Sequence, residues 1–164
     1  MWLIAAIVAA GSVGTNVHLP PSDTLDLAVE LGGGWVRVDF NWDIAQPTSG
    51  ATDWALFDAL VDAAEARGLK VYATIGYCPA WASASGDRGG DGPTNDVPDA
   101  TAYKDFVQAA AERYGTRVAM WGTWNEPNLG DFFSGTRTQY IQDILVNGAH
   151  AVKAADPGAS VCGP

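Results

Sequence analysis

Basic residues are scarce in this chain. Of its 164 residues only nine are lysine or arginine, against 19 aspartates and glutamates, and the formal net charge is −10. No cluster of basic side chains occurs in the sequence, so a phosphate backbone would be repelled rather than bound. We therefore expect no nucleic-acid partner, and the acidity favours a neutral substrate.

Cysteine is equally rare, with Cys78 and Cys162 as its two occurrences. Neither has a second cysteine or a histidine at the spacing of a metal site. Both fall at the ends of predicted strands that are not neighbours, so a disulfide is not favoured and small buried thiols are expected. We predict no metal and no cofactor.

Apolar runs long enough to cross a bilayer are also missing. Residues 1–10 (MWLIAAIVAA) are apolar but too short for a span, and they lack the basic flank of an ordinary signal peptide. The small residues that follow resemble a cleavage region. We expect residues 1–12 to be a signal remnant or a strand that feeds the fold, no membrane span, and a secreted or extracellular protein.

Apolar residues and tryptophan are plentiful, at 48% and seven residues, which is enough for one domain with a substantial core. Strand and helix patterns alternate along residues 13–164. Strands are predicted at 13–18, 35–40, 70–76, 118–124 and 159–162, and helices at 22–31, 52–67, 99–114 and 138–154. Such alternation predicts parallel strands with right-handed crossovers, either in an open doubly wound sheet or in part of an eight-fold barrel.

The barrel is favoured because polar and aromatic residues gather where each strand ends. They include His18, the segment 39–42, the segment 77–81 and the pair Asn125–Glu126. Barrel enzymes build their sites at that rim, whereas the glycine-rich phosphate fingerprint of dinucleotide-binding folds is absent after the first strand. We predict an α/β fold, a (β/α)8 TIM barrel of which this chain carries about the first four and a half β/α units.

The segment 119–128 (AMWGTWNEPN) is the most informative part of the chain. It predicts a short apolar strand that stops at Asn125-Glu126-Pro127, with a carboxylate at the mouth of the sheet beside an amide and indoles. Burial against apolar walls raises the pKa of a Glu and suits it to donate a proton. A Glu that caps the next helix or pairs with a neighbouring loop is the alternative, and spacing alone leaves both open.

Three motifs, which follow one another along the chain on the second, fourth and fifth predicted strands, resemble motifs of the clan A retaining glycoside hydrolases, near families 5 and 39. Residues 124–127 (WNEP) are similar to the clan's acid/base segment at the end of strand four. Residues 34–42 (GWVRVDFNW) are similar to its arginine-bearing second strand, and residues 154–164 to the entry of its fifth strand. The resemblance covers nearly all of residues 14–164, as the N-terminal half of a barrel.

This resemblance implies hydrolysis of O-glycosidic bonds in poly- or oligosaccharides by two carboxylates about 5 Å apart. Glu126 matches the general acid/base and Asn125 the amide that binds the sugar 2-hydroxyl. Arg37 matches the arginine beneath the nucleophile, and a salt bridge inside the barrel is compatible with that role. The nucleophile should be a Glu ending a seventh strand, and the sequence stops in the fifth.

We therefore expect a fragment of a longer polypeptide, since half a barrel leaves two sheet edges open. Alone, it would self-associate, await a missing C-terminal half, or act as a non-catalytic carbohydrate-binding half-barrel or inactive fragment.

Further candidates for substrate binding lie around this segment. His18 could hydrogen-bond a sugar hydroxyl or serve the fold. Trp42, Trp81 and Trp124 could stack on sugar faces, although several indoles must belong to the core.

Overall fold

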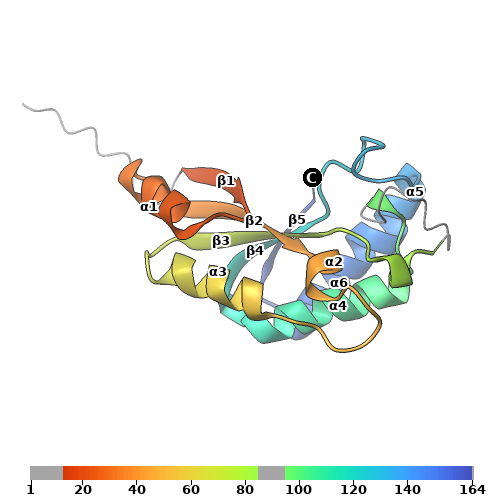
Figure 1. The fold of residues 1–164 in the computed structure, drawn as a ribbon. Coiled ribbons are helices and arrows are strands. Elements are labelled where there is room, and N and C mark those ends of the chain that lie inside the picture. Colours follow the sequence, from red (N-terminus) through yellow and green to blue (C-terminus); the bar gives the residue numbers. More distant parts are fainter. Residues whose placement is uncertain (1–12, 85–94, 164) are drawn as a thin grey trace, which may run out of the picture.

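A parallel sheet of five strands runs through the computed structural model, which describes residues 13–84 and 95–163 (Figure 1). The strands pair in sequence order and every pairing is parallel. They are β1 Gly14–His18, β2 Trp35–Asn41, β3 Lys70–Gly76, β4 Val118–Thr123 and β5 Ser160–Cys162. The predicted parallel α/β arrangement is confirmed.

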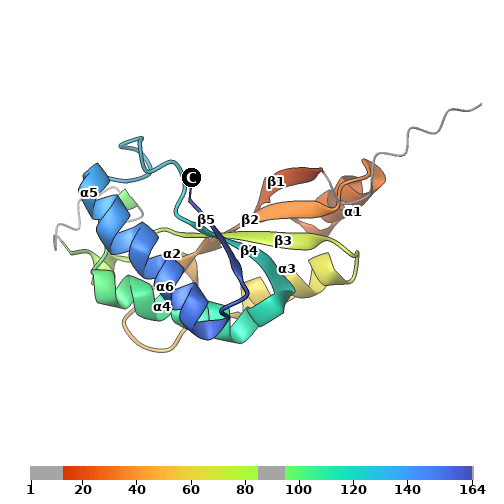
Figure 2. The ribbon, with the colours of Figure 1, turned by 180° about the vertical axis from the view of Figure 1, so that it is seen from behind.

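Helices connect successive strands. They are α1 Ser22–Glu30, α2 Trp42–Ala45, α3 Ala55–Glu65, α4 Ala100–Tyr114, α5 Arg137–Gln139, the π-helical stretch η4 Tyr140–Val146 and α6 Asn147–Ala155, with short 3₁₀ turns at η1 Ala80–Ala82 and η3 Gly115–Arg117. Figures 1 and 2 show α3, α4 and α6 on the same side of the sheet. A doubly wound sheet reverses its strand order and carries helices on both faces, so the sequential order and the one-sided cover identify part of a (β/α)8 barrel.

The two faces of β2 show how the sheet divides its side chains. Val36, Val38 and Phe40 are completely buried. The ring of Phe40 stacks on Phe57 of α3 with 4.5 Å between centroids, so this set faces the helices. Because side chains alternate along a strand, Arg37 and Asp39 point to the opposite face, the inner face of the barrel.

The inner face is partly open. A pocket of about 380 Å³ lies on it, lined by Thr15, Asn16, Trp35, Arg37, Tyr72 and Met120. The Tyr72 ring crosses Gly122, where a Cβ would come within 2.7 Å of ring carbon Cε2. A residue without a side chain is therefore needed at position 122 to let this ring lie across the sheet.

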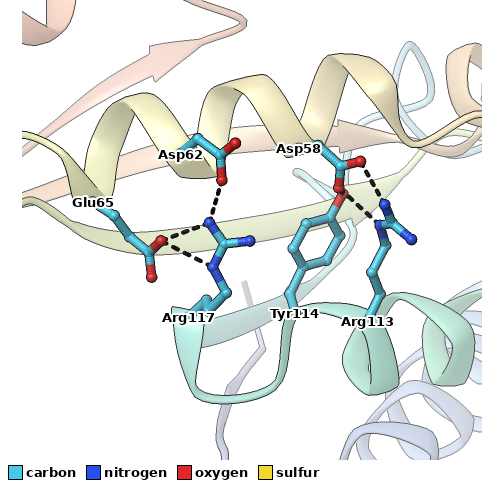
Figure 3. Close-up of polar contacts among 6 residues, drawn as sticks. All are labelled: Asp58, Asp62, Glu65, Arg113, Tyr114 and Arg117. Carbon is cyan, nitrogen blue, oxygen red and sulfur yellow. Dashed lines mark hydrogen bonds and ion pairs between the residues drawn. The ribbon is translucent and has the colours of Figure 1, made fainter.

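Ion pairs tie α3 to the end of α4 on the outer surface (Figure 3). Arg113 Nε donates to Asp58 Oδ1 over 2.8 Å, and the Tyr114 hydroxyl donates to the same oxygen over 3.0 Å. Arg117 pairs with both Asp62 and Glu65. The hydrogen bond from Arg113 is the main reason that the pKa of Asp58 lies below its usual value.

Most predicted boundaries hold to within one or two residues. Asp99 caps α4 through hydrogen bonds from two backbone N–H groups, and Gly68 follows α3 with a φ of 69°. The second helix begins at Ala55 rather than at 52–53, with Asp53 Oδ1 accepting a hydrogen bond from Ala55 N. The short helix α2 was not predicted.

Both cysteines are free thiols, Cys78 buried and Cys162 half-buried. Within residues 13–84 and 95–163, no helix combines the length and the apolarity that crossing a bilayer requires. The segment 1–12, which the sequence suggested as a signal remnant, lies outside the described residues.

Candidate active site

Polar side chains from four strand ends meet at the C-terminal rim of the sheet. His18 ends β1, Asp39 lies near the end of β2, Tyr77 directly follows β3, and Asn125 and Glu126 follow β4. The carboxyl ends of parallel strands share one edge of the sheet, so residues far apart in sequence become neighbours there.

The backbone at this rim is strained. His18, Trp124 and Glu126 have φ values of 54°, 72° and 42°, and they are the non-glycine residues with positive φ among those described. This left-handed region is costly for residues with a side chain, and strain of this kind clusters at functional sites. All three lie beside the sequence-predicted site.

Arg37 and Asn125 are brought together although they are 88 positions apart. Arg37 Nη2 donates to Asn125 Oδ1 over 2.9 Å. The guanidinium also lies over the Tyr72 ring, 5.6 Å from its centroid. The bond to Oδ1 fixes which way the amide points, so the two N–H donors of Asn125 can serve the Tyr77 hydroxyl and one further acceptor.

Tyr77 is the residue whose hydroxyl hydrogen-bonds with Asn125, and the sequence analysis did not assign it a role. Burial raises the pKa of the Tyr77 hydroxyl first, and the negative charge of Asp39 raises it further. A hydrogen bond with Asn125 and the charge of Arg37 act in the opposite direction, while Glu126 adds to the rise. Tyr77 therefore stays protonated, and its hydroxyl lies beside Asn125.

His18 is held by Asp39. The His18 Nδ1 atom lies 2.8 Å from Asp39 Oδ2, with the histidine side chain 67% exposed and the carboxylate 12% exposed. Asp39 belongs to the segment 39–42 that the sequence places at the rim, but no motif predicts its pairing with His18, because that pairing depends on the register of β1 against β2. That register carries an irregularity between Asn16 and His18.

Glu126 departs from one expectation. Its side chain is exposed rather than buried against apolar walls. The helix-cap alternative is excluded, because the next helix is α5 and Thr136 caps it. Among the residues described, no cation forms an ion pair with Glu126 either. Within residues 13–84 and 95–163 the carboxylate is thus presented to the rim without an ion-pair partner.

Two of the three tryptophans predicted to stack on sugars lie in the core. Trp42 and Trp124 are 0% and 1% exposed, and the Trp124 ring packs on Tyr77 and Phe133 while its Nε1 donates to Phe132 O over 2.7 Å. A ring without an exposed face cannot stack on a sugar, so these two are corrected to core residues.

Trp81 is half-buried, and its Nε1 donates to Gln46 O over 2.8 Å. It lines a pocket of about 320 Å³ together with residues of α4, such as Asp105 and Phe106. Trp81 therefore lies between the loop after α2 and helix α4, and within the described residues its hydrogen bond and ring contact do not reach the residues around Glu126.

The described residues hold no group of three or more His, Cys, Asp or Glu side chains that is suited to a metal ion. What the rim offers instead is an exposed carboxylate, an oriented amide, a phenol and a histidine–carboxylate pair. Such a set can exchange a proton and hydrogen-bond the hydroxyls of a neutral ligand.

Two curated relatives of this chain are both named beta-xylosidase. The chain is 30% identical to a beta-xylosidase of Geobacillus stearothermophilus over 68% of this chain and 24% of that enzyme. It is 28% identical to a beta-xylosidase of Caldicellulosiruptor saccharolyticus over 80% of this chain and 29% of that enzyme. No protein-family model matches the chain.

Solved structures agree with the fold. The GH39 enzyme from Xanthomonas axonopodis pv. citri superimposes with a TM-score of 0.74 and 25% identity, over 94% of this chain and 35% of that one. The chain thus spans about a quarter to a third of the length of these relatives. The expected resemblance is confirmed over that part.

Proposed function

This chain is related to the clan A glycoside hydrolases near family 39, and we propose that it carries the acid/base part of a retaining β-glycosidase site. The observation that carries the proposal is Glu126: an exposed carboxylate with no ion-pair partner in the described part of the chain, on a strained backbone, beside an amide that Arg37 orients. In this role Glu126 protonates the leaving oxygen and later deprotonates the attacking water.

Asn125 would bind the sugar next to the bond that breaks. Its Oδ1 accepts from Arg37, so its NH2 group can donate to a hydroxyl oxygen of the sugar. Such a contact strengthens as positive charge develops on the ring, and it then stabilises the transition state more than the bound substrate.

Arg37 is placed to support a second carboxylate on the inner face of the barrel. No carboxylate among the described residues pairs with Arg37, although it lies on the inner face of the barrel. A nucleophilic carboxylate from another part of the polypeptide would complete the site, and the cation would keep it ionised. The relatives named beta-xylosidase point to β-xylosides as the substrate class to try first.

The test is turnover by the polypeptide as its gene encodes it, in wild-type and Glu126→Gln forms. Loss of the general acid should lower kcat/KM on xylobiose by about 10²–10⁴-fold. It should lower kcat/KM on an activated aryl β-xyloside much less, because that leaving group needs little protonation. Asp131→Asn, which changes another exposed carboxylate of the same loop, is the matched control and should leave both rates unchanged.

An equal loss on the two substrates would contradict the acid/base role. A second candidate is carbohydrate binding without catalysis, because Asn125 and His18 can hydrogen-bond sugar hydroxyls whether or not a bond is cleaved. It predicts heat of binding with xylobiose in calorimetry, no hydrolysis, and no change in that binding in the Glu126→Gln variant.

Location and partners are proposals of the same kind. The apolar run at residues 1–10 supports secretion, and N-terminal sequencing of the mature protein would test it. The edge strands β1 and β5 support association with further strands of the barrel or with a second copy.

A further inference from the structure

His18 has one ring nitrogen committed and one unused. Asp39 Oδ2 lies 2.8 Å from Nδ1. An ionised carboxylate can only accept a hydrogen bond, so Nδ1 must carry the proton. In the neutral ring this leaves Nε2 as an acceptor, the reverse of the form that an unconstrained histidine prefers.

Asp39 is placed to impose this form. It sits on β2 with 12% of its side chain exposed, one position from the fully buried Phe40, so its carboxylate has little freedom to turn away. The histidine side chain is 67% exposed. The unused nitrogen is therefore available to a ligand at the rim.

The pair belongs to the same cluster as the acid/base segment. Asp39 lies two positions after Arg37 on the same face of β2, and Arg37 Nη2 donates to Oδ1 of Asn125, the neighbour of Glu126, over 2.9 Å. His18 also shares with Glu126 the left-handed backbone that marks this rim.

We propose that Asp39 is a positioning residue that fixes His18 in its Nδ1–H form, so that Nε2 accepts a hydrogen bond from a hydroxyl of the sugar bound beside Glu126. The inference rests on the proposed function. An acceptor of this kind selects for a hydroxyl that can donate. A sugar with fluorine or a methoxy group at that position cannot donate and leaves Nε2 without a partner.

The first arm of the test reads the ring itself. Long-range ¹H–¹⁵N NMR distinguishes a protonated from an unprotonated ring nitrogen, and the chain has two histidines, so the exposed His150 of α6 is an internal reference. At a pH where both rings are neutral, His18 should carry its proton on Nδ1 and His150 mainly on Nε2. Asp39→Asn should shift the His18 proton toward Nε2, and Asp131→Asn should not.

The second arm reads selectivity in the full polypeptide. Methyl β-D-xylopyranoside is compared with its 3- and 4-deoxyfluoro derivatives, since the 2-hydroxyl is assigned to Asn125. One of the two derivatives should bind about 10- to 100-fold more weakly than the parent sugar. Asp39→Asn should shrink that ratio toward one, an effect that a merely structural His18–Asp39 pair would not produce.

The proposal is overturned if His18 carries its proton on Nε2 in the wild type, or if Asp39→Asn changes neither the ring nor the selectivity. It is also overturned if the ring changes and selectivity does not. The tautomer is measured without any sugar, whereas the Glu126→Gln comparison measures proton donation. A failure of the acid/base role is therefore distinguishable from a failure of this one.

Discussion

Replacing Phe40 with alanine tests whether one face of β2 packs against the helices as part of the core while the other faces the inside of the barrel. The ring is completely buried, stacked on Phe57 at 4.5 Å and edge-on to Trp121 at 6.0 Å between centroids. A buried phenylalanine withdraws roughly 150–250 Å² from water, at about 25 cal/mol per Å². With the alanine methyl retained and a cavity left behind, the variant should lose about 3–5 kcal/mol of unfolding free energy.

Urea unfolding followed by tryptophan fluorescence measures this loss. For an m-value of about 2 kcal/mol/M, the midpoint should fall by about 2 M. Leu129→Ala is the control, because that side chain is 44% exposed in the loop after β4 and its removal should cost less than about 0.5 kcal/mol. If Phe40→Ala lost no more stability than Leu129→Ala, the helix-facing core described for β2 would be refuted.

Two further predictions concern charge and hydrogen bonding. Asp58→Asn should cost about 0.5–1 kcal/mol at pH 7, since the exposed pair with Arg113 is screened by water. Because the pKa of Asp58 is lowered by folding, that contribution is present above the unfolded value of about 4 and vanishes as the pH falls through the lower folded value. The urea midpoints of the two proteins should therefore draw together as the pH falls below about 4, and a constant gap would contradict the pairing. Tyr77→Phe keeps the ring against Trp124 but removes the hydroxyl that hydrogen-bonds with Asn125. The kcat/KM of the full polypeptide should therefore fall about 2- to 10-fold, with little change in the urea midpoint. An unchanged kcat/KM would mean that the hydroxyl does not help to position the amide.

The architecture was readable because it rests on local signals. The apolar stretches, the cap at Asp99 and the glycine at position 68 each predict an element or its end from a few neighbouring residues. Helix α2 was not predicted because it lacks such a signal: its four residues make a single turn, which is too short to show a periodic pattern.

The site was only partly readable because its contacts are not local. The family resemblance nominated Arg37 and Asn125, and the structure joins them over 2.9 Å. The bond between His18 and Asp39 spans 21 positions and depends on strand register, which no motif encodes. Composition could not separate indoles that line a cleft from those that fill a core, and Trp42 and Trp124 proved to be the second kind.

The turn that carries Asn125 and Glu126 is held by contacts with β2, β3 and the core. Trp124, whose φ is 72°, is locked by a hydrogen bond from its backbone N–H to Ile75 O over 2.8 Å and by its ring contacts in the core. That lock fixes the turn on which Asn125 and Glu126 stand. Strain held by core packing can be kept before a ligand arrives, so the donor geometry does not depend on substrate to form. A carboxylate supplied by another part of the polypeptide would then meet a prepared partner, and its entry next to Arg37 would be the step that completes the site.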